Sequence, residues 1–167
     1  IDAIINLKRK DITEDGNFRF KPQKREKASR LVPVHSALEE IVARLVKGKK
    51  PDDDLFPECP PVPEGKAQER SSPASKAFTY YRRRLGITAL VEGKRRDRVN
   101  FHSFRRWFIT KAYQANQPEI VVQLVVGHKP QSISGSVYLG GLTREQLKEC
   151  VEAVRLPPAQ QPEQASP

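Results

Sequence analysis

Four residues within one stretch of the chain carry side chains that can act together on a phosphate. They are His102, Arg105, His128 and Tyr138, and no other stretch holds two of the three histidines together with a neighbouring arginine and tyrosine. An arginine can hold a phosphate through two parallel hydrogen bonds, and imidazoles supply further donors. A phenol aimed at the same phosphate can act as a nucleophile. The spacing therefore points to phosphoryl chemistry.

The first histidine and the arginine lie near the predicted start of a helix. Asn100 is a typical N-cap residue, and apolar side chains then recur at helical spacing: Phe104, Trp107, Phe108, Ala112 and Tyr113. Arg105 follows His102 by three positions, so both side chains lie on one face. Unpaired N–H groups and a partial positive charge gather at a helix N-terminus, which predicts an anion site here.

A second predicted helix delivers the other histidine. Pro118 suits its start and Gly127 its end, and its expected buried stripe is Ile120, Val121, Leu124 and Val125. His128 follows the glycine directly, and Tyr138 comes ten residues later in a segment rich in serine and glycine. Taken singly, each residue also fits a structural role, His128 as a helix C-cap and Tyr138 as a half-buried tyrosine.

The ordered set resembles the signature of the tyrosine recombinases, the phage integrase family of site-specific DNA recombinases. That signature is H-x-x-R, then a leucine-glycine-histidine helix end, then a nucleophilic tyrosine a short distance later. The matching segments here are HSFR from His102 to Arg105, VVGH ending at His128, and SVYLGG around Tyr138. Each segment alone arises often by chance, whereas the three in order are specific. The resemblance covers about residues 1–154.

The resemblance implies a mechanism for these residues. Tyr138 would attack a scissile phosphate of double-stranded DNA and form a 3′-phosphotyrosine with a free 5′ hydroxyl. Arg105 and His102 would hold the non-bridging oxygens, and His128 would complete the phosphate pocket. No metal, ATP or other cofactor is expected, because the covalent intermediate keeps the energy of the phosphodiester. The family acts as a synaptic tetramer on DNA, so a homo-oligomer is expected.

In the family a β-hairpin delivers a lysine that protonates the departing 5′ oxygen. Residues 21–29 form a basic hairpin tip here, and counting back from the strand that starts at Arg30 puts Lys24 in the matching place. Lys21 and Lys27 are the alternatives. The tip can also be read as a charged turn that only touches backbone phosphates.

The beginning of the chain matches the tail of another family pattern, which carries a first catalytic arginine. Ala3 stands where that pattern usually has glutamate, and in this register the arginine would lie just before Ile1. The chain begins at Ile1 and contains no methionine, so we expect a fragment or a processed domain. Loss of one such arginine is expected to lower activity on the order of 10²-fold or more. We expect an N-terminally truncated catalytic domain at residues 1–156 and a disordered tail at residues 157–167.

Composition agrees with a polyanionic partner. The 30 lysines and arginines outweigh 20 acids and give a net charge of +10, which favours nucleic acid over a neutral ligand. Cys59 and Cys150 lack the spacing of a metal site, and we expect both to be reduced. No apolar run has the length of a membrane span. We expect a cytoplasmic, DNA-associated protein encoded by a bacterium or phage.

Basic residues near the proposed site are the expected contacts to the DNA backbone. They flank the HSFR segment, lie within it or belong to the hairpin tip: Arg82, Arg83, Arg84, Lys94, Arg95, Arg96, Arg98, Arg106, Lys21, Arg25 and Lys27. A purely solubilising role is the alternative for these charges.

The expected fold is α+β and mainly α, a tyrosine-recombinase catalytic domain with a small antiparallel sheet of about three strands between Asp11 and Val34. A helix is expected from Ser36 to Gly48, followed by a proline-rich surface loop at residues 51–73. The next helix, residues 75–85, should bury Ala77, Phe78, Tyr81 and Leu85 and expose its arginines. A last helix, capped by Thr143, should bury Leu147, Cys150, Val151 and Val154 and pack either in cis or on a neighbouring protomer.

Three functions remain open from the sequence. The first is a recombinase catalytic domain acting in DNA integration, excision or transposition. The second is a topoisomerase-like strand relaxer that uses the same chemistry without bringing two duplexes together. The third is a non-catalytic DNA-binding module that keeps the fold, since fold alone does not fix activity.

Overall fold

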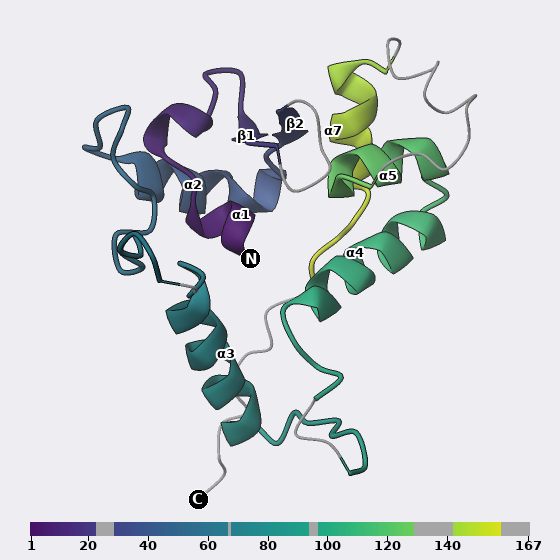
Figure 1. The fold of residues 1–167 in the computed structure, drawn as a ribbon. Helices are drawn as coiled ribbons and strands as arrows, with labels where there is room; N and C mark the ends of the chain where they lie inside the picture. The colour runs from purple at the N-terminus through teal and green to yellow at the C-terminus, as the bar shows by residue number, and fades with distance from the viewer. Residues whose placement is uncertain (23–28, 67, 94–96, 129–141, 158–167) are drawn as a thin grey trace, which may run out of the picture.

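The computed structural model describes residues 1–22, 29–66, 68–93, 97–128 and 142–157. In chain order the elements are α1 (Asp2–Ile5), η1 (Arg9–Asp11), β1 (Asn17–Phe20), β2 (Arg30–Pro33), η2 (Ser36–Leu38), α2 (Glu39–Val46), α3 (Ser72–Arg84), α4 (His102–Gln114), α5 (Glu119–Val126) and α7 (Arg144–Glu152). In Figure 1 the hairpin lies with α1 and α2 on one side, α4, α5 and α7 lie on the other, and α3 runs below. None of the described helices has the length and apolar character needed to cross a membrane.

The sheet is a short antiparallel hairpin. Phe18 lies opposite Val32 and Phe20 opposite Arg30. The expected sheet of about three strands is not confirmed, because the described residues form two strands and Ile12 joins them only through an isolated bridge to Phe18. The reason is local: η1 ends at Asp11, and a turn with Gly16 at a φ of 75° follows at once. Too few residues remain between them to extend a strand.

The larger core joins α4, α5, α7 and β2. Ala112, Val122 and Cys150 are almost fully excluded from solvent, and Trp107 and Val32 pack against them. α7 is therefore docked in cis, and Thr143 begins it with a capping box to Gln146. The predicted last helix is confirmed, as is the burial of its Cys150, Val151 and Val154.

Polar contacts tie the last helix to the hairpin side of the molecule. The Ser36 backbone N–H and hydroxyl donate to the two carboxylate oxygens of Glu152, at 2.8 and 2.7 Å. These hydrogen bonds hold the pKa of Glu152 below its ordinary value. On the same helix, Arg144 pairs with Asp15 in the turn before β1. α7 thus connects the two halves of the fold.

A second core lies beneath the hairpin and uses part of the segment that the sequence marked as a surface loop. Leu7, Ile12 and Leu55 are buried together, with Phe18 and Val42 packed against them. The expectation of an exposed loop at residues 51–73 was wrong for Leu55 and for Cys59, which are 2% and 4% exposed. Apolar residues within a proline-rich segment can still be buried where the chain folds back on the core. Both cysteines of the chain are free and buried.

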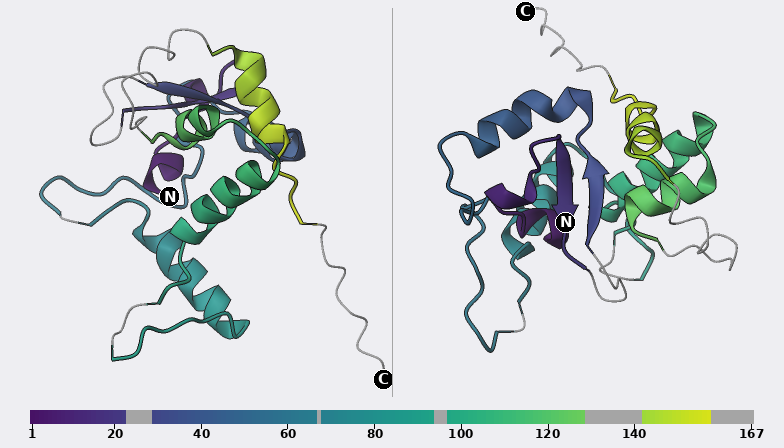
Figure 2. Two further views of the ribbon diagram at one scale, coloured as in Figure 1. Left: turned by 90° about the vertical axis from the view of Figure 1, so that its right-hand side faces the viewer. Right: turned by 90° about the horizontal axis from the view of Figure 1, so that it is seen from above.

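Helix α3 is held at its start and through Phe78 in its middle, and it projects away from the rest of the molecule (Figures 1 and 2). At its start, the buried Ser71 donates its N–H to the Asp2 carboxylate of α1 at 3.2 Å. Further along, Phe78 stacks with Phe101 and Phe104 at centroid distances of 4.4 and 5.4 Å. These contacts hold α3 against the beginning of α4.

The predicted buried face of α3 was wrong for most of its members. Tyr81 and Leu85 are 61% and 55% exposed, and Ala77 is exposed too. Phe78 is partly buried, and Arg82, one helical turn further along the same face, is 4% exposed. The helix therefore turns a face with one aromatic ring and one guanidinium toward the protein, and the remaining apolar side chains point away.

Candidate active site

The first turn of α4 is fixed by a pair of reciprocal hydrogen bonds. The Asn100 side-chain oxygen accepts the His102 N–H at 2.9 Å, and the Ser103 hydroxyl accepts the Asn100 N–H at 3.1 Å. These bonds satisfy N–H groups that have no partner inside the helix. The N-cap is Phe101, which makes no side-chain capping hydrogen bond, so the prediction of Asn100 as the N-cap was wrong by one position, and the helix begins at His102.

His102 and Arg105 therefore belong to the first turn of the same helix. His102 is exposed, whereas Arg105 is partly buried and its Nε is shielded from solvent. The apolar side chains behind them differ from the prediction: Phe104 and Tyr113 are 56% and 45% exposed. Ala112 carries the deepest contact of α4 instead, because it faces α5.

His128 reaches the site through the end of α5. Gly127 adopts the left-handed conformation, with φ 72° and ψ 33°, which a glycine adopts without steric cost. The N–H groups of Gly127 and His128 then bond to the carbonyls of Leu124 and Gln123, at 3.1 and 2.8 Å. This is a Schellman motif, which reverses the chain at the helix end. The predicted helix stop is confirmed, and the turn fixes the backbone of His128.

His128 lies within electrostatic range of the first turn of α4. Its pKa is lowered from the ordinary value of 6.5, first by partial burial and then by the positive charges of Arg105 and His102. His128 is thus favoured in the neutral form near pH 7, as a donor or acceptor through its imidazole. Two imidazoles and a guanidinium converge at a helix N-terminus, so an anion bound there would gain from all of them.

We predict that the pKa of His128, followed through its imidazole resonances by NMR, lies below 6.5 and rises toward 6.5 in Arg105→Gln, because a repelling charge is removed. Because protonation is easier in the unfolded chain, the contribution of His128 to stability is present above pH 6.5 and declines as the pH falls below it. Lys111→Gln removes a charge further along α4 and should leave His128 unchanged. An unaltered His128 titration in Arg105→Gln would mean that the two side chains are not neighbours.

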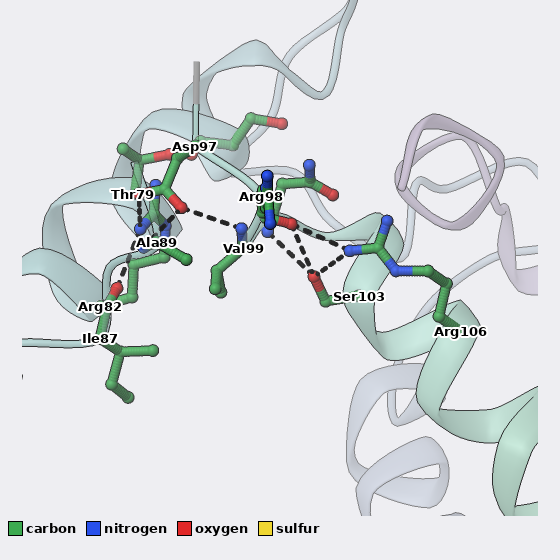
Figure 3. Close-up of polar contacts among 11 residues, drawn as sticks. Thr79, Arg82, Ile87, Ala89, Asp97, Arg98, Val99, Ser103 and Arg106 are labelled. Carbon is green, nitrogen blue, oxygen red and sulfur yellow. Dashed lines mark hydrogen bonds and ion pairs between the residues drawn. The ribbon is translucent and has the colours of Figure 1, made fainter. Parts of the chain in front are cut away.

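Arg82 is not available as a DNA contact, contrary to the prediction. Its guanidinium is buried and pairs with Asp97 at 2.6 Å, with side chains 4% and 6% exposed. It also donates to the Ile87 carbonyl at 2.9 Å. Figure 3 shows this contact beside the segment that leads to Ser103 and Arg106 of α4. The buried guanidinium of Arg82 needs an acidic partner, and Asp97 supplies it.

The other predicted DNA contacts that the structure describes are exposed, as contact with phosphates requires. These are Lys21 at the end of β1, Arg83 and Arg84 on α3, Arg98 before α4 and Arg106 on it. Arg106 is held in place, because its guanidinium donates to the Arg98 carbonyl and the Ser103 hydroxyl, both at 2.9 Å (Figure 3). The predicted exposure of Arg83 and Arg84 is confirmed, and the contact of all five side chains with DNA remains a prediction.

We predict that Arg84→Gln weakens binding to any DNA duplex and reduces the slope of log affinity against log salt by about one, because one phosphate contact is lost. Arg82→Gln should leave that slope unchanged and lower the thermal midpoint by about 10 °C, because it leaves Asp97 buried without its partner. Salt titrations of duplex binding and thermal melts separate the two. Equal salt slopes for Arg84→Gln and the unsubstituted protein would exclude Arg84 from the interface.

Several predicted site residues lie outside the described part of the chain. They include the expected nucleophile Tyr138 and the expected general acid Lys24, with Arg25, Lys27, Lys94, Arg95 and Arg96. The expected disordered tail also lies there, except for Pro157. Their roles remain predictions.

Sequence reasoning missed one residue next to the site, Asp97. It accepts hydrogen bonds from Arg82 and from the N–H groups of Ala89 and Val99, and these bonds hold its pKa below the ordinary value. The available signal was Arg82 itself, which follows Phe78 by four positions and so shares its face of α3.

Two open surface grooves do not include the candidate residues. One runs along α3 from Ser75 to Arg83, and one lies between Arg9 and Arg19 of the hairpin side. Within the described ranges, no group of histidine, cysteine and acidic residues has the arrangement of a metal site.

Comparison with known protein families gives one match. The model of the phage integrase family matches residues 1–141, which include His102, Arg105, His128 and Tyr138 and end before α7. No curated protein and no solved structure shows significant similarity to the chain.

Proposed function

Because the chain belongs to the phage integrase family, we propose that it is the catalytic domain of a site-specific DNA recombinase, which cleaves and rejoins DNA strands through a 3′-phosphotyrosine. The observation that carries this proposal is the match of the family model to residues 1–141, which include the signature residues His102, Arg105, His128 and Tyr138. Two of them, His102 and Arg105, share the first turn of α4, and His128 directly follows the Schellman turn that ends α5. The charges of Arg105 and His102 act on His128, which supports a common site.

In the proposed reaction Tyr138 attacks the scissile phosphorus. A bond forms between its phenolic oxygen and phosphorus, and the bond from phosphorus to the 5′ oxygen breaks. Lys24 gives a proton to that leaving oxygen. Attack by a 5′ hydroxyl of another strand reverses the step and releases Tyr138, so no net hydrolysis occurs.

The described cluster would stabilise the transition state of this reaction. Arg105 and His102 would bind the non-bridging oxygens, on which negative charge increases as the tyrosine attacks. The N-terminal end of α4 adds a fixed positive potential at the same place. Charge stabilisation by such preorganised donors is usually the largest catalytic contribution. His128, favoured as neutral imidazole, would complete the pocket as a hydrogen-bond donor.

The test is covalent trapping. The full gene product that carries this chain is incubated with nicked suicide duplexes taken from the DNA flanking its gene, where the short 5′-hydroxyl fragment diffuses away after cleavage. We expect a protein–DNA band that survives SDS and disappears after protease treatment. Salt-sensitive binding to these duplexes without any such band would favour the non-catalytic binding module.

Recombination also requires that two duplexes be held together, which we propose occurs in a homo-oligomer on DNA. Exchange of strands between two labelled duplexes would support this. Relaxation of supercoiled DNA by single copies, with no exchange at any protein concentration, would instead favour the topoisomerase-like alternative.

A further inference from the structure

The described residues between α3 and α4 are positioned by polar contacts as well as by the Phe101 ring, which packs on Phe78 of α3. Ile87 and Leu90 are 49% and 64% exposed, so hydrophobic burial contributes little to their placement. The Asp97 carboxylate organises the segment instead. One oxygen accepts the N–H groups of Ala89 and Val99, at 3.1 and 2.9 Å, and the other accepts the Arg82 guanidinium at 2.6 Å.

The ion pair between Arg82 and Asp97 is buried, whereas the ion pair between Lys10 and Asp52 lies at the surface. Both side chains are at most 6% exposed, whereas those of Lys10 and Asp52 are 49% and 74% exposed. A buried ion pair is weak evidence for stability, because desolvation of two charges offsets their attraction. Its directional bonds nevertheless define one geometry for the groups that it joins. The end of α3 is therefore held in one arrangement relative to Ala89, Asp97 and Val99.

A series of hydrogen bonds leads from this pair to α4. Consecutive bonds in the series are joined by at most one residue of backbone. Asp97 holds Val99, and the neighbouring Arg98 carbonyl accepts the Arg106 guanidinium of α4. The Ser103 hydroxyl accepts both Arg106 and the Asn100 N–H. The Asn100 side chain in turn accepts the His102 N–H. Figure 3 shows the line of contacts from Arg82 through Asp97 and Arg98 to Ser103 and Arg106.

We infer that Asp97, held by Arg82, is a positioning residue for the phosphate site: it sets the first turn of α4 and thereby the placement of His102 and Arg105. The expected effect of Asp97 on catalysis rests on the proposed function, whereas its effect on the placement of His102 and Arg105 does not. Asp97 touches no substrate and acts through the backbone of residues 97–102. Displacement of catalytic groups by a fraction of a bond length can cost on the order of 10²-fold in rate.

The test compares Asp97→Asn with Asp52→Asn in the full gene product. Asparagine at position 97 keeps the oxygen that accepts Ala89 and Val99 but turns an amide toward Arg82, so it breaks the ion pair alone. Asp52→Asn removes an exposed ion pair with Lys10 and serves as the control for the loss of an ion pair. For each variant, single-turnover cleavage of the suicide duplex, duplex affinity, the thermal midpoint and the NMR titrations of His102 and His128 are measured well below the melting temperature.

We expect Asp97→Asn to cleave about tenfold to a hundredfold more slowly at saturating DNA, with duplex affinity little changed and the titration of His128 shifted. Asp52→Asn should match the unsubstituted protein in all of these. If Asp97→Asn melts earlier but cleaves and titrates like Asp52→Asn, the inference is overturned and the pair serves stability alone.

Two further outcomes are separable. If the unsubstituted protein forms no covalent complex, the proposed function fails, while the histidine titrations still decide whether Asp97 positions the cluster. If Asp97→Asn does not fold, Ser103→Ala interrupts the same line of hydrogen bonds at its more exposed end. A Ser103→Ala protein with normal cleavage and normal histidine titrations would overturn the inference.

Discussion

We expect Tyr138→Phe to abolish the covalent protein–DNA complex while the protein still binds duplex DNA. The substitution removes one hydroxyl oxygen, which is the atom that would bond to phosphorus, and leaves the aromatic ring in place. No neighbouring group can replace a nucleophile that must become part of the intermediate. We therefore expect the SDS-resistant band to fall below detection, with duplex affinity within about twofold of the unsubstituted protein.

Tyr113→Phe is the matched control, because Tyr113 is 45% exposed on α4 and lies beyond the proposed site. It should form the complex at the normal rate. A covalent complex that persists in Tyr138→Phe would show that another residue is the nucleophile. The exposed Tyr80 and Tyr81 of α3 would then be the first to replace.

Arg105→Lys is expected to slow cleavage of the suicide duplex by about 10²-fold to 10³-fold at saturating DNA. Lysine keeps the positive charge but cannot form two parallel hydrogen bonds to a phosphate. Because this contact strengthens as charge develops on the non-bridging oxygens, the loss falls on the rate of the chemical step more than on duplex affinity. Single-turnover kinetics and a binding titration measure the two separately.

Lys111→Gln serves as the control on the same helix, since Lys111 is exposed and bonds only to Gln114 among the contacts described for it. It should cleave normally. An Arg105→Lys protein with an unchanged cleavage rate would mean that a bidentate arginine is not needed there, and the assignment of Arg105 to the phosphate would be wrong.

The local features of the site were predictable because each depends on residues close together in the chain. Asn100 bonds to the N–H of His102 two residues later, and Thr143 bonds to Gln146 at the start of α7. Gly127 adopts the left-handed conformation that its place after an apolar stripe indicated. Caps and turns are decided within a few residues, so sequence alone specifies them.

The grouping of His102, Arg105 and His128 was predictable through the family signature rather than through packing. α4 and α5 are joined by a short connection and pack on each other through Ala112, Val121 and Val122. The short connection between the two helices makes them neighbours, as is usual for consecutive elements. The charges of Arg105 and His102 contribute to the lowered pKa of His128.

The tertiary structure alone decided which face of α3 is buried. The sequence pattern of α3 placed Tyr81 and Leu85 inside and Arg82 outside, whereas Arg82 is 4% exposed and the two apolar residues face solvent. Burial depends on what lies opposite a helix, and here that partner is Asp97, fifteen positions further along the chain.

The sequence by itself determined the end of α5, the start of α7 and the family, since near neighbours or a family signature specify them. The tertiary structure decided that Leu55 enters the core from a proline-rich loop, that the hairpin gains no third strand among the described residues, and that Asp97 binds Arg82 and Val99. These outcomes depend on contacts between distant segments, whose energies arise only when the chain has folded.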